Sequence, residues 1–138
     1  MVNHRQHTIR AVDGHEIHVQ SWEPDTGTTA VIQVLHGLGE HIARYDRFAQ
    51  AATARGIALI GHDHRGHGPH SDDLGYFAGK DGWSKVVGDA GTVNDWIREH
   101  YPDQPVIMLR HSMGSFIAQA FAMHYGDRLK GMLLSAST

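Results

Sequence analysis

The stretch Leu109-Arg110-His111-Ser112-Met113-Gly114 decides how this chain of 138 residues is interpreted. Residues 106–109 form a short apolar run that predicts a buried strand, and residues 113–125 have the apolar spacing of a helix. The sequence therefore predicts Ser112 at the tip of a tight turn between a strand and a helix. The pattern is close to G-x-S-x-G, with Arg110 in the place of the first glycine.

Strands and helices are predicted to alternate on either side of this turn. Residues 7–12 and 16–22 alternate between polar and apolar around Asp13-Gly14, which is a strong hairpin signal. Further strands are predicted at 30–35, 57–60, 106–109 and 131–134, helices at 45–52 (stopped by Gly56), 84–100 (capped by Ser84) and 113–125, and a long loop at 61–82. This order predicts an α/β fold in one domain over residues 1–138: a mostly parallel sheet with helices on both faces, preceded by an N-terminal hairpin.

Composition argues against several classes of function. The formal net charge of −3 gives no basic surface for nucleic acid, and no apolar run is long enough to span a membrane. The absence of cysteine excludes disulfides and thiolate-bound metals. Residues 1–10 are polar and basic and lack the apolar core of a signal peptide, so a cytoplasmic location is predicted.

The predicted turn exposes Ser112 where it can act as a nucleophile. Ester hydrolysis by serine needs an exposed hydroxyl, a base, an acid that orients the base, and N–H donors for the oxyanion. The N–H of Met113, at the start of the following helix, is one candidate donor. The N–H of Leu38 is the second, because His36-Gly37-Leu38-Gly39 is a flexible turn after an early strand.

Several motifs in the same order resemble those of a known family. From about Gly14 onward the chain is similar to the monoacylglycerol lipases and lysophospholipases, which are serine hydrolases with the α/β-hydrolase fold. The resemblance is carried by His36-Gly37-Leu38-Gly39-Glu40-His41, Arg44-Tyr45, Asp63-His64-Arg65-Gly66-His67-Gly68, Tyr76-Phe77-Ala78 and His111-Ser112-Met113-Gly114-Ser115. It implies that Ser112 is the nucleophile, that Leu38 and Met113 form the oxyanion hole, and that the substrate is a small lipid ester. Asp63 is expected to stabilise a turn, and no cofactor or metal is expected.

The sequence departs from the family pattern in two respects. Family members have glycine at the position of Arg110, so this side chain is expected to strain the turn or to push the helix away, and Arg110→Gly is expected to stabilise the fold. The second departure is length, because the acid, the histidine and the lid of the family follow the last predicted strand. The chain is therefore interpreted as the N-terminal part of a single α/β-hydrolase domain, a truncated α/β-hydrolase fold without the lid and the C-terminal strands.

The sequence offers no clear replacement for the missing base and acid. His124, the only histidine after Ser112, lies 12 residues further along a predicted helix, which corresponds to roughly 18 Å. Asp127 is the only acid after Ser112, and His111 is expected to point away from its neighbour. His36 and His41, on the oxyanion loop, are nearer candidates for the base but lack an orienting carboxylate.

The sequence alone is compatible with three interpretations of function. The first is hydrolysis of carboxylic esters by Ser112, and the second is an inactive truncated fragment or pseudo-enzyme that lacks the acid and the histidine. The third is metal binding by the closely spaced histidines of the long loop, His62, His64, His67 and His70. In addition, the uncharged strand at 131–134 is expected to be an exposed sheet edge, which predicts self-association.

Overall fold

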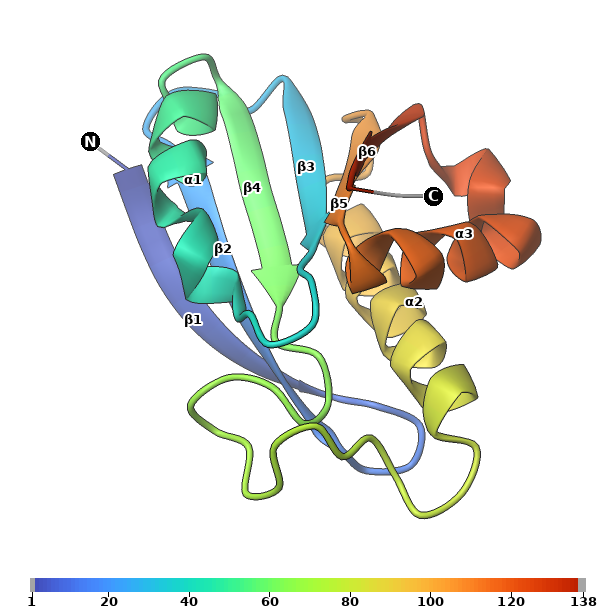
Figure 1. Ribbon diagram of the computed structural model, residues 1–138. Coiled ribbons are helices and arrows are strands. Elements are labelled where there is room, and N and C mark those ends of the chain that lie inside the picture. Colours follow the sequence, from blue (N-terminus) through green and yellow to red (C-terminus); the bar gives the residue numbers. More distant parts are fainter. Residues whose placement is uncertain (1, 137–138) are drawn as a thin grey trace.

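A six-stranded sheet organises residues 2–136, the part of the chain that the computed structural model describes (Figure 1). The strand order is β1-β2-β4-β3-β5-β6. The strands are β1 (Val2–Arg10), β2 (Glu16–Pro24), β3 (Ala30–Leu35), β4 (Ile57–His62), β5 (Val106–His111) and β6 (Gly131–Ser135). β4, β3, β5 and β6 are parallel to one another, whereas β1 and β2 form an antiparallel hairpin that joins the sheet through β4. The predicted hairpin and the mostly parallel sheet are both confirmed.

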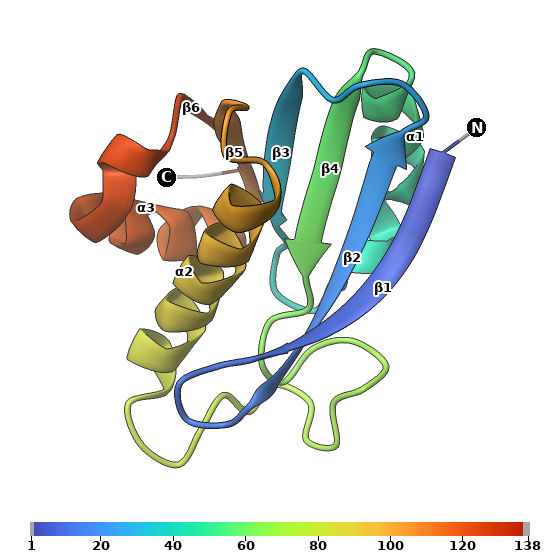
Figure 2. The same cartoon turned by 180° about the vertical axis from the view of Figure 1, so that it is seen from behind.

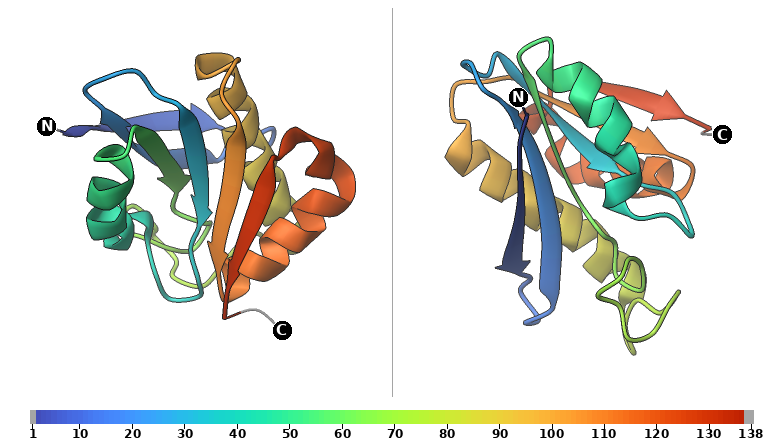
Figure 3. Two further views of the ribbon diagram at one scale, coloured as in Figure 1. Left: turned by 90° about the horizontal axis from the view of Figure 1, so that it is seen from above. Right: turned by 90° about the vertical axis from the view of Figure 1, so that its left-hand side faces the viewer.

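Helices cover both faces of this sheet, as predicted. The short 3₁₀ helix η1 (Ile42–Tyr45) and α1 (Asp46–Thr53) lie on one face. The other face carries α2 (Gly82–His100) and α3 (Met113–Tyr125), which lead through the 3₁₀ helix η2 (Gly126–Arg128) into β6. Figure 2 shows α2 crossing the sheet, and the end-on view of Figure 3 separates α1 from α2 and α3.

Side chains of β3 alternate between the two cores, as a strand buried on both faces requires. Ile32 and Val34 pack in the cluster beneath α1, together with Trp22 and Leu59. Val31 belongs to the cluster on the opposite face, with Val93 of α2. These alternating contacts fix the position of the carboxyl end of β3, where the predicted oxyanion loop begins.

Several element boundaries differ from the predicted ones, and β2, β4, β5 and β6 each end one or two residues later than predicted. β1 begins at Val2 because residues 2–6, although mostly polar, pair with β2 up to Pro24. The predicted helix at 45–52 is divided between η1 and α1. The helix predicted to be capped by Ser84 begins at Gly82, after Asp81 in a left-handed conformation (φ 54°), with no side-chain cap.

Strand order places a topological switch point at the carboxyl end of β3. The chain leaves β3 through α1 toward β4 on one side, whereas β5, on the other side of β3, continues into α3 on the opposite face. In open α/β sheets ligands bind where connections diverge in this way. The loop that contains Leu38 and the turn that contains Ser112 both lie at this point.

β6 is the outermost strand on this side of the sheet, and its apolar residues are exposed. Leu133 and Leu134 each keep 53% of their surface accessible although they point to opposite faces. The neighbouring helix α3 exposes Phe116 and Met123, which lie seven residues apart and hence on one side of the helix. Among the described helices, none is both long and apolar enough to cross a membrane.

Candidate active site

The turn between β5 and α3 holds Ser112 in a backbone conformation that side chains rarely adopt. Ser112 has φ 51° and ψ −118°, immediately before the first residue of α3. A positive φ in a residue other than glycine stores strain, which tends to be kept where a side chain has a task. Its hydroxyl does not cap the helix, and no hydrogen bond joins it to another described residue. The predicted position of the serine at the tip of a sharp turn is confirmed.

Close packing against the end of β3 holds this turn in place. A Cβ added to Gly114 would overlap the Leu35 carbonyl oxygen and would lie 2.7 Å from that of His36. The N–H of Ser112 donates to the carbonyl oxygen of Ser135 at 2.9 Å, which connects the turn to β6. Gly114 therefore brings the N-terminus of α3 directly against the oxyanion loop.

Arg110 fits within this packing, contrary to the expectation that it would strain the turn. Its side chain is 3% exposed and runs beside β6, where Nε donates to the Leu133 carbonyl oxygen at 3.2 Å. A second guanidinium nitrogen lies 3.3 Å from the sulfur of Met132. Gly114 of α3 nevertheless stays packed against the end of β3, so the predicted displacement of the helix is wrong, because the Arg110 side chain leaves the turn along β6.

The predicted oxyanion loop, residues 36–39, packs against the residue that precedes the serine. A Cβ on Gly37 would lie 3.2 Å from Cδ2 of the His111 ring. The N–H of Gly37 donates to Oε2 of Glu40 at 2.7 Å, and the N–H of Glu40 donates to the carbonyl oxygen of Gly37 at 3.3 Å. The N–H of Leu38 has no acceptor among the described residues. The N–H of Met113, the first residue of α3, is likewise left without an intrahelical acceptor.

The candidate bases are not joined to Ser112. Nδ1 of His111 lies 3.1 Å from the Ser135 hydroxyl, and both ring nitrogens of His36 are engaged elsewhere. His41 keeps a buried Nδ1 without a hydrogen-bond partner. His124 lies at the far end of α3, as predicted, and Asp127 lies in η2. Within the described residues, therefore, no imidazole is positioned by a hydrogen bond to accept the serine proton.

The loop histidines are distributed in a way that gives no support to metal binding. His62 and His64 are buried side by side, with ring centroids 5.1 Å apart, whereas His70 stacks on His18 of β2 at 4.1 Å. In residues 2–136 no group of three or more His, Asp or Glu side chains is arranged to hold a metal ion. Burial lowers the pKa of His62 to about 3, so this side chain is neutral at neutral pH.

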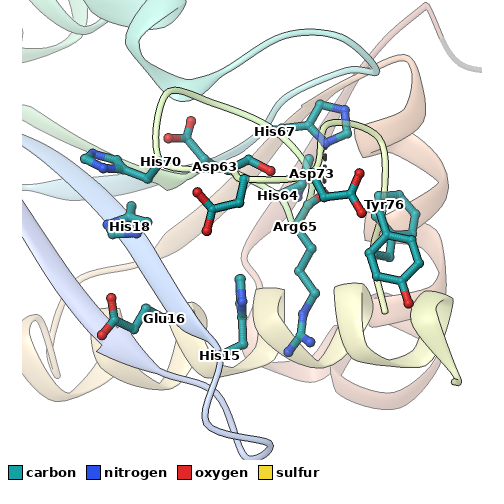
Figure 4. Close-up of a pocket in the computed structure, with 14 residues that line it drawn as sticks. His15, Glu16, His18, Asp63, His64, Arg65, His67, His70, Asp73 and Tyr76 are labelled. Atoms are coloured by element: carbon teal, nitrogen blue, oxygen red, sulfur yellow. Dashed lines mark hydrogen bonds between the residues drawn. The ribbon is translucent and has the colours of Figure 1, made fainter. Parts of the chain in front are cut away.

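Two open cavities lie on either side of the loop that follows β4. One, of about 350 Å³, is bounded by this loop and the hairpin, and Figure 4 shows that His15, Glu16 and His18 of the hairpin line it together with Asp63 and His70 of the loop. The other, of about 470 Å³, is lined by Leu38 and Leu74 among others. The second cavity adjoins the predicted oxyanion loop and offers an apolar surface beside Leu38.

Two contributions to the site were not predicted from the sequence. The first is Glu40, which accepts a hydrogen bond from the N–H of Gly37 and so fixes this turn. The signal in the sequence was the spacing of three residues between Gly37 and Glu40, because this spacing suits a side chain that returns to an earlier N–H.

The second is Arg65, which is 5% exposed and makes two hydrogen bonds each to Asp13 of the hairpin and Asp89 of α2. Arg65 holds the pKa of Asp13 well below its usual range. No local sequence pattern predicts the contact of Arg65 with Asp13 and Asp89, because the three residues are far apart in the sequence.

Asp63 stabilises a turn, as expected. Its Oδ1 accepts the N–H of Ile42 at 2.8 Å and so fixes the start of η1. Burial raises the pKa of this carboxyl group, while the hydrogen bond from Ile42 opposes that rise. The side chain therefore connects the loop after β4 to the segment after β3.

Comparisons with known proteins identify the family of the chain. Residues 26–138 match the family model described as serine aminopeptidase, S33. The monoacylglycerol lipase of Mycolicibacterium smegmatis is 35% identical over 136 residues, which are 94% of this chain and 45% of that protein. The monoglyceride lipase of Mus musculus is 33% identical, over 93% of this chain and 41% of its own length. The chain thus spans less than half the length of these relatives.

Solved structures show the same arrangement of strands and helices. A thermostable carboxyl esterase from Bacillus coagulans superposes with a TM-score of 0.86 at 30% sequence identity. The superposition covers 97% of this chain and 44% of the esterase. The expected α/β-hydrolase fold is thereby confirmed.

Proposed function

Because this chain belongs to the serine aminopeptidase S33 family of α/β-hydrolases, we propose that it supplies the nucleophile and the oxyanion hole of a carboxylic-ester hydrolase. Ser112 is the nucleophile, and the N–H groups of Leu38 and Met113 stabilise the oxyanion. The strained backbone of Ser112 at the start of α3, with a hydroxyl that makes no hydrogen bond to any of residues 2–136, is the observation that carries this proposal.

The proposed substrates are small lipid esters of the monoacylglycerol or lysophospholipid type. Two observations support this class. The named relatives are monoacylglycerol lipases at 33–35% identity. The cavity beside Leu38 also presents the side chains of Leu38 and Leu74, which are 69% and 76% exposed, to an apolar chain.

Selective phosphonylation of the serine tests the nucleophile. The 138-residue chain is treated with a fluorophosphonate at alkaline pH, where hydroxide can serve as the base, and the modified residues are located by mass spectrometry. Ser84, which is exposed in the first turn of α2, is an internal control in the same molecule. We expect Ser112 to be modified at least about 10²-fold faster than Ser84, because one oxyanion donor typically accelerates such a reaction by about this factor. Equal modification of the two serines would refute the proposal.

Turnover by this chain alone is expected to be negligible. Since no described imidazole hydrogen bonds to Ser112, a base must come from outside residues 2–136. Loss of a triad member typically lowers turnover by about 10⁴-fold. The measurement is hydrolysis of p-nitrophenyl butyrate. Rapid hydrolysis that disappears in Ser112→Ala would show that a local histidine serves as the base after all.

A further inference from the structure

His36 is buried at the carboxyl end of β3, and both of its ring nitrogens have partners. Nδ1 lies 2.8 Å from the carbonyl oxygen of Gly37, and Nε2 lies 3.0 Å from the backbone nitrogen of His64. A carbonyl oxygen can only accept and a backbone N–H can only donate. Nδ1 therefore carries the hydrogen and Nε2 is bare, which defines one neutral tautomer of His36.

The hydrogen bond from Nδ1 sets the direction of the proposed oxyanion donor. The carbonyl of Gly37 and the N–H of Leu38 belong to one peptide unit, which is planar and trans. When the carbonyl is held by the His36 ring, the N–H of Leu38 must point the opposite way. The N–H of Glu40 donates to the same carbonyl oxygen at 3.3 Å and supports this orientation.

His64, in the loop after β4, holds His36 in turn. Its backbone N–H donates to Nε2 of His36, and its own Nε2 donates to the His36 carbonyl oxygen at 3.0 Å. The two rings pack with centroids 4.0 Å apart, and His64 is 1% exposed. The loop after β4 is thus fastened to the loop after β3 by two hydrogen bonds between one pair of residues.

From this chain of contacts we propose that His36 and His64 form a pair of positioning residues that aim the N–H of Leu38 into the oxyanion hole. The inference rests on the proposed function only in assigning a purpose to that N–H. His36 acts through the Gly37 carbonyl, and His64 acts through His36. Neither ring is required to touch the substrate.

The pair works in its neutral form. Protonation of Nε2 of His36 would set two N–H groups against each other, since the His64 N–H already points there. Burial lowers the pKa of His36 to about 4 and that of His64 well below its usual value. The titratable side chains that act on the pair are Glu40, His41, His62 and His67, and of these only the carboxylate of Glu40 favours protonation.

Paired substitutions distinguish the two sides of the His36 ring. The amide nitrogen of asparagine can replace Nδ1 as donor to Gly37, whereas the amide oxygen of glutamine can replace Nε2 as acceptor from His64. We therefore expect the Leu38 amide signal in ¹⁵N–¹H spectra to stay near its wild-type position in His36→Asn. In His36→Gln it should move by several times as much, because the carbonyl of Gly37 is no longer held by a donor from residue 36. Identical behaviour of Leu38 in both variants would overturn the proposal.

Substitution of His64 gives a second, independent comparison. His64→Gln keeps a donor at the position of Nε2, and His64→Asn does not, so only the asparagine variant is expected to shift Leu38. In the wild-type chain, ¹⁵N shifts of the His36 ring at pH 7 must show hydrogen on Nδ1. Hydrogen on Nε2 would refute the pairing even if every variant failed to fold. These readouts do not depend on the reactivity of Ser112, so they can fail or succeed separately from the phosphonylation test.

Discussion

Gly114→Ala tests how closely α3 packs against the end of β3. The added methyl group would overlap the Leu35 carbonyl oxygen and lie 2.7 Å from the His36 carbonyl oxygen. Both oxygens belong to backbone at the end of a central strand, so neither can move aside cheaply. Overpacking of this kind costs about 3 kcal/mol at the upper end of its range. Alanine regains about 1 kcal/mol of helix propensity. The free energy of unfolding is therefore expected to fall by about 2 kcal/mol.

Gly88→Ala is the matched control in α2. A Cβ at this position would meet no atom within 4 Å, so only the gain in helix propensity should remain. Urea unfolding followed by circular dichroism should show a lower midpoint for Gly114→Ala and an unchanged or higher one for Gly88→Ala. If both variants unfold at the wild-type urea concentration, the close approach of α3 to β3 is not what holds this turn.

Four further outcomes are expected. Burial lowers the pKa of His36 to about 4 and that of His62 to about 3, so the unfolded chain binds protons that the folded chain does not. Unfolding free energy should be fully present above pH 6.5 and should fall by about 3 kcal/mol per histidine as the pH drops toward 4. A urea midpoint that stays constant over this range would contradict the burial of both rings. Arg65→Met should cost about 3–5 kcal/mol in urea unfolding, because it leaves the buried carboxylate of Asp89 without its partner; a loss below about 1 kcal/mol would contradict this. Arg110→Gly should lower stability by about 1–3 kcal/mol, because the bond to the Leu133 carbonyl oxygen is lost, and a higher midpoint would restore the original expectation of overpacking. The exposed β6 edge should cause concentration-dependent association in light scattering, and a stable monomer would exclude this edge as an interface.

Elements with strong local patterns were predictable from the sequence. The apolar run of β3, the hairpin at Asp13-Gly14 and the helix after Ser112 all formed where the pattern indicated. The alternation of strands and helices along the chain was then sufficient to predict the parallel sheet and the helices on its faces, because consecutive parallel strands must be joined by a crossover connection, which is usually a helix. The tip position of Ser112 followed from the same pattern.

Features that depend on distant contacts were not predictable in this way. Capping preference predicts that α2 starts at Ser84, but Asp81 adopts a left-handed conformation three residues earlier and α2 begins at Gly82. Arg110 was judged by the space that the family allows at its position, whereas its side chain reaches β6, a strand 21 residues further on. The neutral tautomer of His36 depends on a backbone N–H 28 residues away, which no local pattern reveals.

The bridge from Arg65 to Asp13 and Asp89 has a consequence for how this chain tolerates change. Residues 66–81 form a loop whose two ends are anchored, one by Arg65 itself and the other by α2, which carries Asp89. Loop closure entropy grows slowly with length, by about 0.6 kcal/mol for each doubling. Insertions near the exposed Leu74 should therefore leave the end of β4 and the segment around His64 where they are. The loop can vary in length and composition to suit different molecules at its rim, while the backbone that presents Ser112 and Leu38 keeps its geometry.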